Sequence, residues 1–276
     1  MNRHIALAAW VLVPGLSFAD SPWLPEPGAT DFTLSYLTQS TDEFFLGEME
    51  ASLPEDFDQE TIGVQFSYGI SDRLALDIAS GWSRSEFIVA PPLANDAELD
   101  GINDTRVRLR YLALDEFQNG GVTLTFSAAL LIEGDYDVGA LNAIGDGASG
   151  LEGALSLGHI FSSGLWVAGE VGYRYQNHDV PNEWFGSVDL GYTITPRLTA
   201  RLGYALVNAV DGIDIGGPGF TPARFPEVEE DYGVFSAGVG FSVTDRFSLS
   251  IDYGNQHDGR NTVKTDIWAL NATFGW

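Results

Sequence analysis

The chain has no cysteine, and its 276 residues include four histidines and a single lysine, Lys264. The absence of thiols excludes a disulfide framework, thiol catalysis and zinc–thiolate sites. The 13 basic residues face 39 acidic ones, for a formal net charge of −26. This balance argues against a nucleic-acid partner, which requires basic clusters. Beyond the first residues no apolar run approaches the roughly 18 residues of a spanning helix. If the chain lives in a membrane, it crosses as strands.

The first residues predict an export signal. A short basic start, Asn2 to His4, precedes an apolar core at residues 5–16, and Ser17 and Ala19 are small residues suited to a cleavage site. We therefore expect a signal peptide at residues 1–19, cut after about Ala19, and one barrel domain at 20–276. The alternative, an uncleaved membrane anchor, is disfavoured because the apolar core is too short to span as a helix.

An apolar–polar alternation runs through most of the mature chain. One example is Ile62, Val64, Phe66 and Tyr68, between which the residues are small or polar. The alternation defines twelve segments of about 10 residues each, the length that a tilted strand needs to cross a bilayer. The chain also has 32 Gly, 17 Phe, 10 Tyr and 7 Trp, a composition that favours β structure. The predicted fold is all-β: a single twelve-stranded antiparallel transmembrane barrel of the outer-membrane type.

Aromatic residues gather near the ends of the predicted strands, as they do at the two water–lipid boundaries of membrane barrels. One expected girdle contains Trp82, Tyr175, Trp184, Tyr232 and Trp268, and the other contains Tyr68, Tyr192, Phe241, Phe274 and Trp276.

The connections alternate in length. Three tight ones repeat a phrase, Ile-Ser-Asp-Arg at 70–73, Ile-Thr-Pro-Arg at 194–197 and Val-Thr-Asp-Arg at 243–246. The other links are longer or acidic and fall at 40–58, 85–100, 134–150, 177–182, 210–231 and 257–262. Short periplasmic turns alternating with longer extracellular loops are typical of outer-membrane barrels. The repeated phrase therefore predicts a periplasmic hairpin turn.

Several stretches resemble a family of Gram-negative outer-membrane proteins that is associated with the meta-pathway of phenol degradation and described as transporters. They are the Pro-Glu-Pro-Gly entry at 25–28 and the segments 68–78, 101–114 and 181–204, and Asn103 replaces a glycine of the family pattern. The resemblance implies a barrel that takes up hydrophobic or aromatic compounds. It also implies that the last strand, ending at Trp276, is read by the barrel assembly machinery.

Charged residues on the polar parity of the strands are expected to line the lumen and to act in transport. The basic ones are Arg106, Arg108, Arg110, Arg174 and Arg201, and the acidic ones are Asp77, Glu133, Glu152, Glu170, Asp189 and Asp252. Such rows can select solutes by charge. Alternatively they pair across the lumen and fill it, because a twelve-stranded barrel is intermediate in width between filled and open barrels.

The acidic loops predict a hydrated rim in contact with outer-membrane lipid and lipopolysaccharide, where cations concentrate. Residues 96–101 resemble the start of an EF-hand, but Val107 stands where the closing Glu belongs, so no metal site is expected. No cofactor is predicted either. The loop at 211–231, with Phe220 and Phe225, could fold inward as a constriction or lie outside.

We expect a non-enzymatic channel for passive uptake of small-molecule solutes. One alternative is a structural or surface-interaction barrel with a closed lumen. Another is a lipid-modifying enzyme, but its serine, histidine and orienting acid would have to come together. No Ser-centred motif accompanies His159, His178 or His257.

Overall fold

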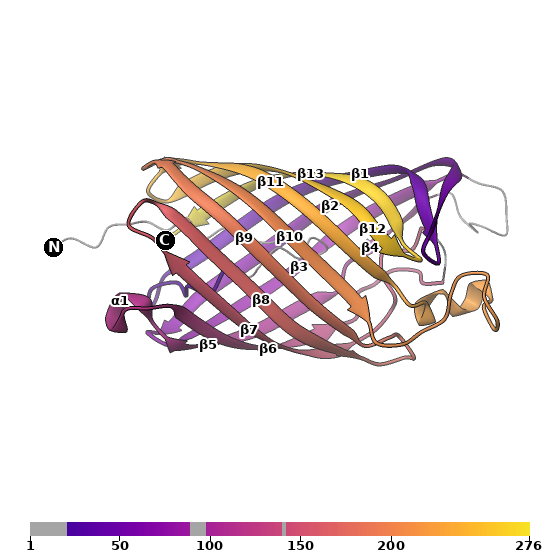
Figure 1. Cartoon of the computed structure of the whole chain (residues 1–276), viewed down its shortest axis with the longest axis horizontal. Helices are drawn as coiled ribbons and strands as arrows, with labels where there is room; N and C mark the ends of the chain where they lie inside the picture. Colours follow the sequence, from indigo (N-terminus) through magenta and orange to yellow (C-terminus); the bar gives the residue numbers. More distant parts are fainter. Residues whose placement is uncertain (1–20, 89–97, 140–141) are drawn as a thin grey trace.

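The computed structural model describes residues 21–88, 98–139 and 142–276, which form one closed antiparallel barrel (Figure 1). The strands are β1 Thr30–Leu46, β2 Met49–Ser71, β3 Leu74–Phe87, β4 Glu98–Ile102, β5 Thr105–Leu114, β6 Thr123–Ile132, β7 Gly150–Ile160, β8 Leu165–Gln176, β9 Glu183–Thr195, β10 Leu198–Ala209, β11 Asp231–Thr244, β12 Phe247–Arg260 and β13 Val263–Gly275, with short helices α1 Glu116–Asn119 and η1 Pro222–Glu227. Because β4 and β5 both pair with β3, they are two halves of one barrel strand. The predicted twelve-stranded antiparallel barrel is therefore confirmed.

The barrel closes between its first and last strands. β1 pairs with β13 on one side and with β2 on the other, and the backbone N–H groups of Thr30 and Trp276 each donate to the other's carbonyl at 3.0 Å. Closure removes both sheet edges, so each strand finds its hydrogen-bond partners within the chain. Among the described residues, no helix has the length and apolar content needed to cross a bilayer.

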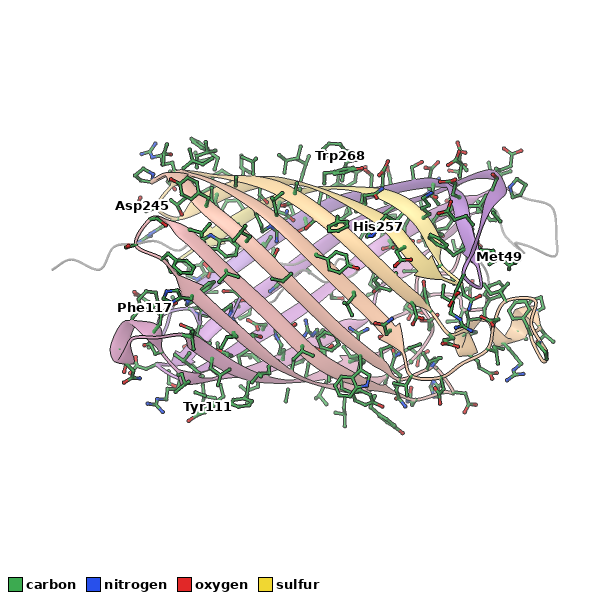
Figure 2. The ribbon with its side chains drawn as sticks, in the orientation of Figure 1. Met49, Tyr111, Phe117, Asp245, His257 and Trp268 are labelled. Carbon is green, nitrogen blue, oxygen red and sulfur yellow. The ribbon has the colours of Figure 1, made fainter. Side chains whose placement is uncertain are left out.

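The side-chain alternation sets the two faces of the wall. On β1, Leu34 and Tyr36 are 45% and 41% exposed, whereas Thr33 and Ser35 between them are buried. Figure 2 shows Tyr111 and Trp268 pointing away from the barrel on opposite sides. The apolar residues of the alternation thus point outward, where they would contact lipid, and the polar residues point into the lumen.

The three repeated phrases form equivalent turns at one end. In each, a hydroxyl two residues before the arginine accepts from the arginine N–H: Ser71 from Arg73, Thr195 from Arg197 and Thr244 from Arg246, at 3.2–3.3 Å. Each arginine carbonyl then accepts from a neighbouring strand, from Leu112, Ser242 and Gly275 respectively. The repeat therefore closes a hairpin and ties it to the next strand. This end, which also carries α1 and the C-terminus, is called the periplasmic end (Figure 1).

At the other, outer end the strands run longer than predicted. Most of the loop expected at 40–58 is a hairpin, since β1 reaches Leu46 and β2 begins at Met49. β12 continues to Arg260, so His257 lies in a strand and not in a loop, and its ring stacks on Phe235 at 4.6 Å. Above the membrane the outward face of a strand meets water and need not be apolar, so no regular apolar–polar alternation marks these extensions.

Tyr232 is a second correction. Instead of joining a girdle, it packs against a buried cluster that includes Leu37. The expected signal peptide at 1–19 lies outside the described residues.

Candidate functional site

The lumen charges lie in small groups of opposite sign, and the group around Asp77 of β3 is buried. Both carboxylate oxygens of Asp77 accept from arginines of β5: Arg108 Nε at 3.0 Å and Arg110 Nη2 at 2.9 Å. Ser67 of β2 donates to the same carboxylate at 2.8 Å. Asp77 and Arg108 are each 3% exposed. The register places them side by side, because Asp77 is the cross-strand partner of Arg108. Two cations thus share one anion.

A second network lies further toward the outer end. Arg106 of β5 pairs with Glu152 of β7, which also lies 3.3 Å from Arg174 of β8. Arg174 extends the chain of charges to Glu183 of β9 at 2.7 Å. The Arg174 guanidinium also lies 5.5 Å from the ring centroid of Phe185. Two arginines and two glutamates balance each other here.

The remaining predicted lumen residues fall into two places. Arg201 of β10 pairs with Asp252 at 2.7 Å and lies 3.8 Å from Asp189, and Glu170 accepts from Ser156 at 2.6 Å. Glu133 is a correction: it follows the last residue of β6, its side chain is 43% exposed, and it lies 3.9 Å from His178. Glu133 therefore belongs to the outer loops. A role of the others in transport stays a prediction.

An inward-facing apolar strip lies on another part of the wall. Leu37 of β1, Val234 of β11, and Ile267 and Ala269 of β13 form one buried cluster, against which Tyr232 packs. Val207 of β10 and Phe185 of β9 are cross-strand partners and are also buried. The apolar–polar alternation did not predict this strip, because its residues stand at positions where polar side chains were expected. Apolar residues at those positions break the alternation, and that break could have indicated the strip.

The lumen also contains the N-terminal segment, residues 21–25, which the sequence gave no reason to place there. Pro22 is fully buried, and its carbonyl accepts from Thr125 of β6 at 2.6 Å. Arg110 donates to the carbonyls of Ser21 and Trp23 at 2.9 and 3.2 Å. Residues 26–29 then cross the periplasmic rim, where Gly28 N–H donates to Gly69 at 2.7 Å. The segment therefore narrows the periplasmic mouth from within.

At the outer end, the connection between β6 and β7 folds into the barrel. Tyr136 donates from its hydroxyl to Asp104 at 2.6 Å, and Ile102 exchanges backbone hydrogen bonds with Asp135. Asn142 is wholly buried, and its carbonyl accepts from the inward hydroxyl of Ser85 on β3. Ile102 at the end of β4 and Asp104 in the break between β4 and β5 thus anchor this connection. It narrows the outer mouth.

Acidic groups face one another beside this connection. Burial raises the pKa of Asp146 well above its usual value, and the neighbouring carboxylates of Glu230 and Glu183 raise it further. Burial also raises the pKa of Glu230 to about 7, although the hydroxyl of Thr262 opposes the shift by donating to the carboxylate. We call Asp146, Glu183 and Glu230 the outer acid cluster. The charge of Glu230 therefore changes with pH near neutrality.

The remaining connections lie beyond the barrel. η1 projects past the strand ends (Figure 1), and Phe220 packs edge-on against Phe225 with centroids 5.2 Å apart. Asn261 joins this connection to the β1–β2 hairpin: its amide oxygen accepts from Gly47 and Ile215, and its amide nitrogen donates to Asp214. The loop at 211–231 therefore lies outside, the second of the two predicted arrangements.

The three histidines among the described residues lie apart. His159 Nδ1 is 2.7 Å from Glu116, His178 Nδ1 lies 3.0 Å from the carbonyl of Gly147, and His257 stacks on Phe235. Across the described residues, none of them is hydrogen-bonded to a serine hydroxyl, and no three potential ligands gather as a metal site would need. Asp96 of the EF-hand-like stretch lies outside those residues.

Comparison with solved structures supports the fold. The COG4313 outer membrane channel from Pseudomonas putida F1 matches with a TM-score of 0.76 and 14% identity, over 96% of this chain and 100% of that chain. The NanC porin matches at 0.53 and 11%, over 89% and 98%. The translocator domain of the autotransporter NalP from Neisseria meningitidis matches at 0.53 and 11%, over 92% and 90%. At these identities the likeness shows the fold alone.

The family comparison shows more than the fold. None of the curated proteins matches the chain. A family model described as "Putative MetA-pathway of phenol degradation" matches residues 84–274, which is more than half of the chain and includes most of the lumen residues discussed above. The resemblance carried by the turns and strand starts is thereby confirmed: this outer-membrane β-barrel belongs to that family.

Proposed function

We propose that the protein is a passive, non-enzymatic channel for small solutes that have an apolar or aromatic part. One observation carries this proposal: the apolar strip around Leu37, Val234 and Ile267 shares the lumen with charges that are already paired. Charges in contact with opposite charges attract a simple ion less strongly, and an apolar inner wall favours a solute with a hydrocarbon ring. An amphipathic solute is suited to such a lumen.

Two further arguments support the proposal. The chain belongs to a family whose description refers to phenol degradation, and its fold is that of a solved outer membrane channel. We propose that the signal at 1–19 directs export, that the strand ending at Trp276 directs assembly, and that the acidic outer loops contact lipopolysaccharide.

The rival is a structural barrel with a closed lumen. The N-terminal segment at one mouth and the inward connection at the other favour it, since both narrow the path. The rival predicts no ion current from folded protein, whereas the channel predicts discrete steps. Conductance therefore separates the two.

Solute preference is tested on the same current. Phenol should reduce the open-channel current reversibly, and cyclohexanol, of similar size but without an aromatic ring, should reduce it less. Ile267→Asn interrupts the apolar strip and should weaken the phenol effect, while Thr265→Ser, two residues away on the same inward face, should leave it intact. Equal responses to both solutes in all three proteins would contradict an aromatic preference.

A further inference from the structure

Trp23 of the N-terminal segment is seated among buried groups of the barrel. Its indole ring packs edge-on against Trp166 of β8, with centroids 6.1 Å apart and an interplanar angle of 84°. The indole Nε1–H donates to Glu116 Oε1 at 2.8 Å. Glu116 belongs to α1, and its side chain is only 5% exposed. One aromatic contact and one directional hydrogen bond therefore hold the ring.

Glu116 is itself held in place from several directions. Thr123 donates to Oε1 at 3.2 Å, the backbone N–H of Ile160 donates to Oε2 at 3.0 Å, and His159 Nδ1 lies 2.7 Å from Oε2. Donors on two strands thus fix the carboxylate independently of Trp23. When the indole leaves, the carboxylate stays oriented and loses only its Nε1–H partner. A preorganised acceptor then faces the lumen.

The space around the indole is open because of a glycine. A Cβ at Gly158 of β7 would lie 2.5 Å from Pro22 and 2.9 Å from the Trp23 ring, so any other residue there would push the segment out. Arg110 completes the surroundings, donating to the carbonyls of Ser21 and Trp23. We call the space bounded by Arg110, Glu116, Gly158 and Trp166 the Trp23 cleft. It offers a ring surface, a buried acceptor and a cationic donor.

We propose that the Trp23 cleft is a solute-binding site that the chain's own Trp23 occupies, and that its ligand is a small aromatic ring bearing an O–H or N–H donor. A phenol reproduces both features of the indole: its ring packs against Trp166, and its hydroxyl donates to Glu116. The inference rests on the proposed function, because the solute reaches the cleft through the lumen, and it adds a location and a chemical requirement.

Occupation of the Trp23 cleft by Trp23 itself lowers the apparent affinity of the protein for a free solute. The segment is tethered, so Trp23 competes at a high effective concentration, and the apparent affinity falls by the fraction of time that the cleft is vacant. Trp23→Ala should empty the cleft while leaving Glu116 and Trp166 in place. The variant should therefore bind phenol at least about tenfold more tightly than the wild type.

The test is calorimetric titration of the folded mature chain in detergent micelles, with empty micelles as the blank. Trp23→Ala should show a gain in phenol affinity that Trp184→Ala, which removes an outward-facing tryptophan, does not. Toluene, which lacks the donor, should bind Trp23→Ala more weakly than phenol, and adding Glu116→Gln should reduce that difference. If Trp23→Ala does not fold, Trp23→Phe serves instead, since it keeps a ring and loses the hydrogen bond.

Equal phenol affinity in wild type, Trp23→Ala and Trp184→Ala would overturn the proposal, as would equal binding of toluene and phenol. Adding Gly158→Val to Trp23→Ala should abolish the gained binding by filling the cleft, and retained binding would also contradict the proposal. The titration tests the binding site without any ion flow through the barrel, and the conductance measurement tests the channel whether or not the Trp23 cleft binds a solute. Binding without conductance would therefore refute the channel and keep the site, and conductance without binding would do the reverse.

Discussion

The two mouths of the barrel are narrowed in different ways. At the periplasmic end, the N-terminal segment makes directed hydrogen bonds with Arg110, Thr125 and Glu116, beside Asp77, which Arg110 shares with Arg108. At the outer end, the connection after β6 carries Asp146, whose pKa is raised by burial and by the carboxyl groups of Glu230 and Glu183, and Glu183 is also paired with Arg174. The first narrowing rests on directed hydrogen bonds to the N-terminal segment, and the second brings acidic groups together at the mouth.

This difference indicates a division of roles. A mouth narrowed by a short tethered segment widens when that segment leaves, so the segment limits how much passes. A mouth lined by acids raises the local concentration of cations and lowers that of anions, so it selects which solutes enter by their charge. Changes at the periplasmic mouth should therefore alter conductance, and changes at the outer mouth should alter selectivity.

Removing the periplasmic narrowing should have the largest effect. Deleting residues 20–25 from the mature chain frees the space beside Arg110, Thr125 and Gly158, and we expect single-channel conductance in planar bilayers to rise several-fold. Deleting the loop residues 216–221 at the outer end serves as a control of equal length and should change conductance little. Equal effects of the two deletions would mean that the segment does not limit flow.

Asp77→Asn should have the next largest effect, on stability. It leaves Arg108 and Arg110 buried without their shared anion, and loss of one partner of a buried ion pair costs about 3 kcal/mol or more. Unfolding by urea in detergent micelles measures the loss. Asp58→Asn makes the same chemical change at an exposed position of β2 and should be nearly neutral. A similar stability for both variants would show that the Asp77 group does not hold the wall.

The outer acid cluster should give a smaller, pH-dependent effect. Because the pKa of Glu230 is raised to about 7, its carboxylate is charged at pH 8 and largely protonated at pH 6. Cation preference, measured as the reversal potential in a salt gradient, should therefore fall as the pH drops through 7. Glu230→Gln should flatten this response, and Asp211→Asn, at an exposed loop acid, should not. Asp146, Glu183 and Asp231 face or adjoin Glu230, and a persistent response in Glu230→Gln would assign the titration to them.

Thr244→Ala should have the smallest effect. It removes the hydroxyl that accepts from Arg246 N–H in an exposed turn, for which a loss of about 0.5 kcal/mol is expected. Ser71→Ala removes the equivalent hydroxyl and should match it in urea unfolding, whereas Thr195→Ala also removes the acceptor of Leu198 N–H and should cost somewhat more. A much larger loss in one variant would show that the three turns are not equivalent.

The sequence was informative where lipid imposes a pattern. Outward residues such as Leu34, Leu202 and Val239 had to be apolar, and their neighbours along the strand small or polar. The number of strands and the side of the wall that each residue faces could therefore be predicted. Outside the hydrocarbon layer that constraint ends. The β1–β2 hairpin beyond Thr41 and the strand position of His257 were missed for this reason.

The lumen was predictable in part. Arg106, Arg108, Arg110, Arg174 and Arg201 were placed on the inward parity, but parity does not say which acid each arginine meets. Those pairs depend on register, as with Asp77 opposite Arg108. The N-terminal segment has no periodicity to read, and its place is set by Trp166, Glu116 and the space at Gly158, which come together only in the closed barrel.

The most direct test of the account is single-channel current from the refolded mature chain in a planar bilayer, with folding shown beforehand by heat-modifiable gel mobility. We predict small discrete steps at pH 8 with cation preference, and larger steps after deletion of residues 20–25. Absence of steps from both proteins, when both are demonstrably folded, would contradict the channel and leave a closed structural barrel.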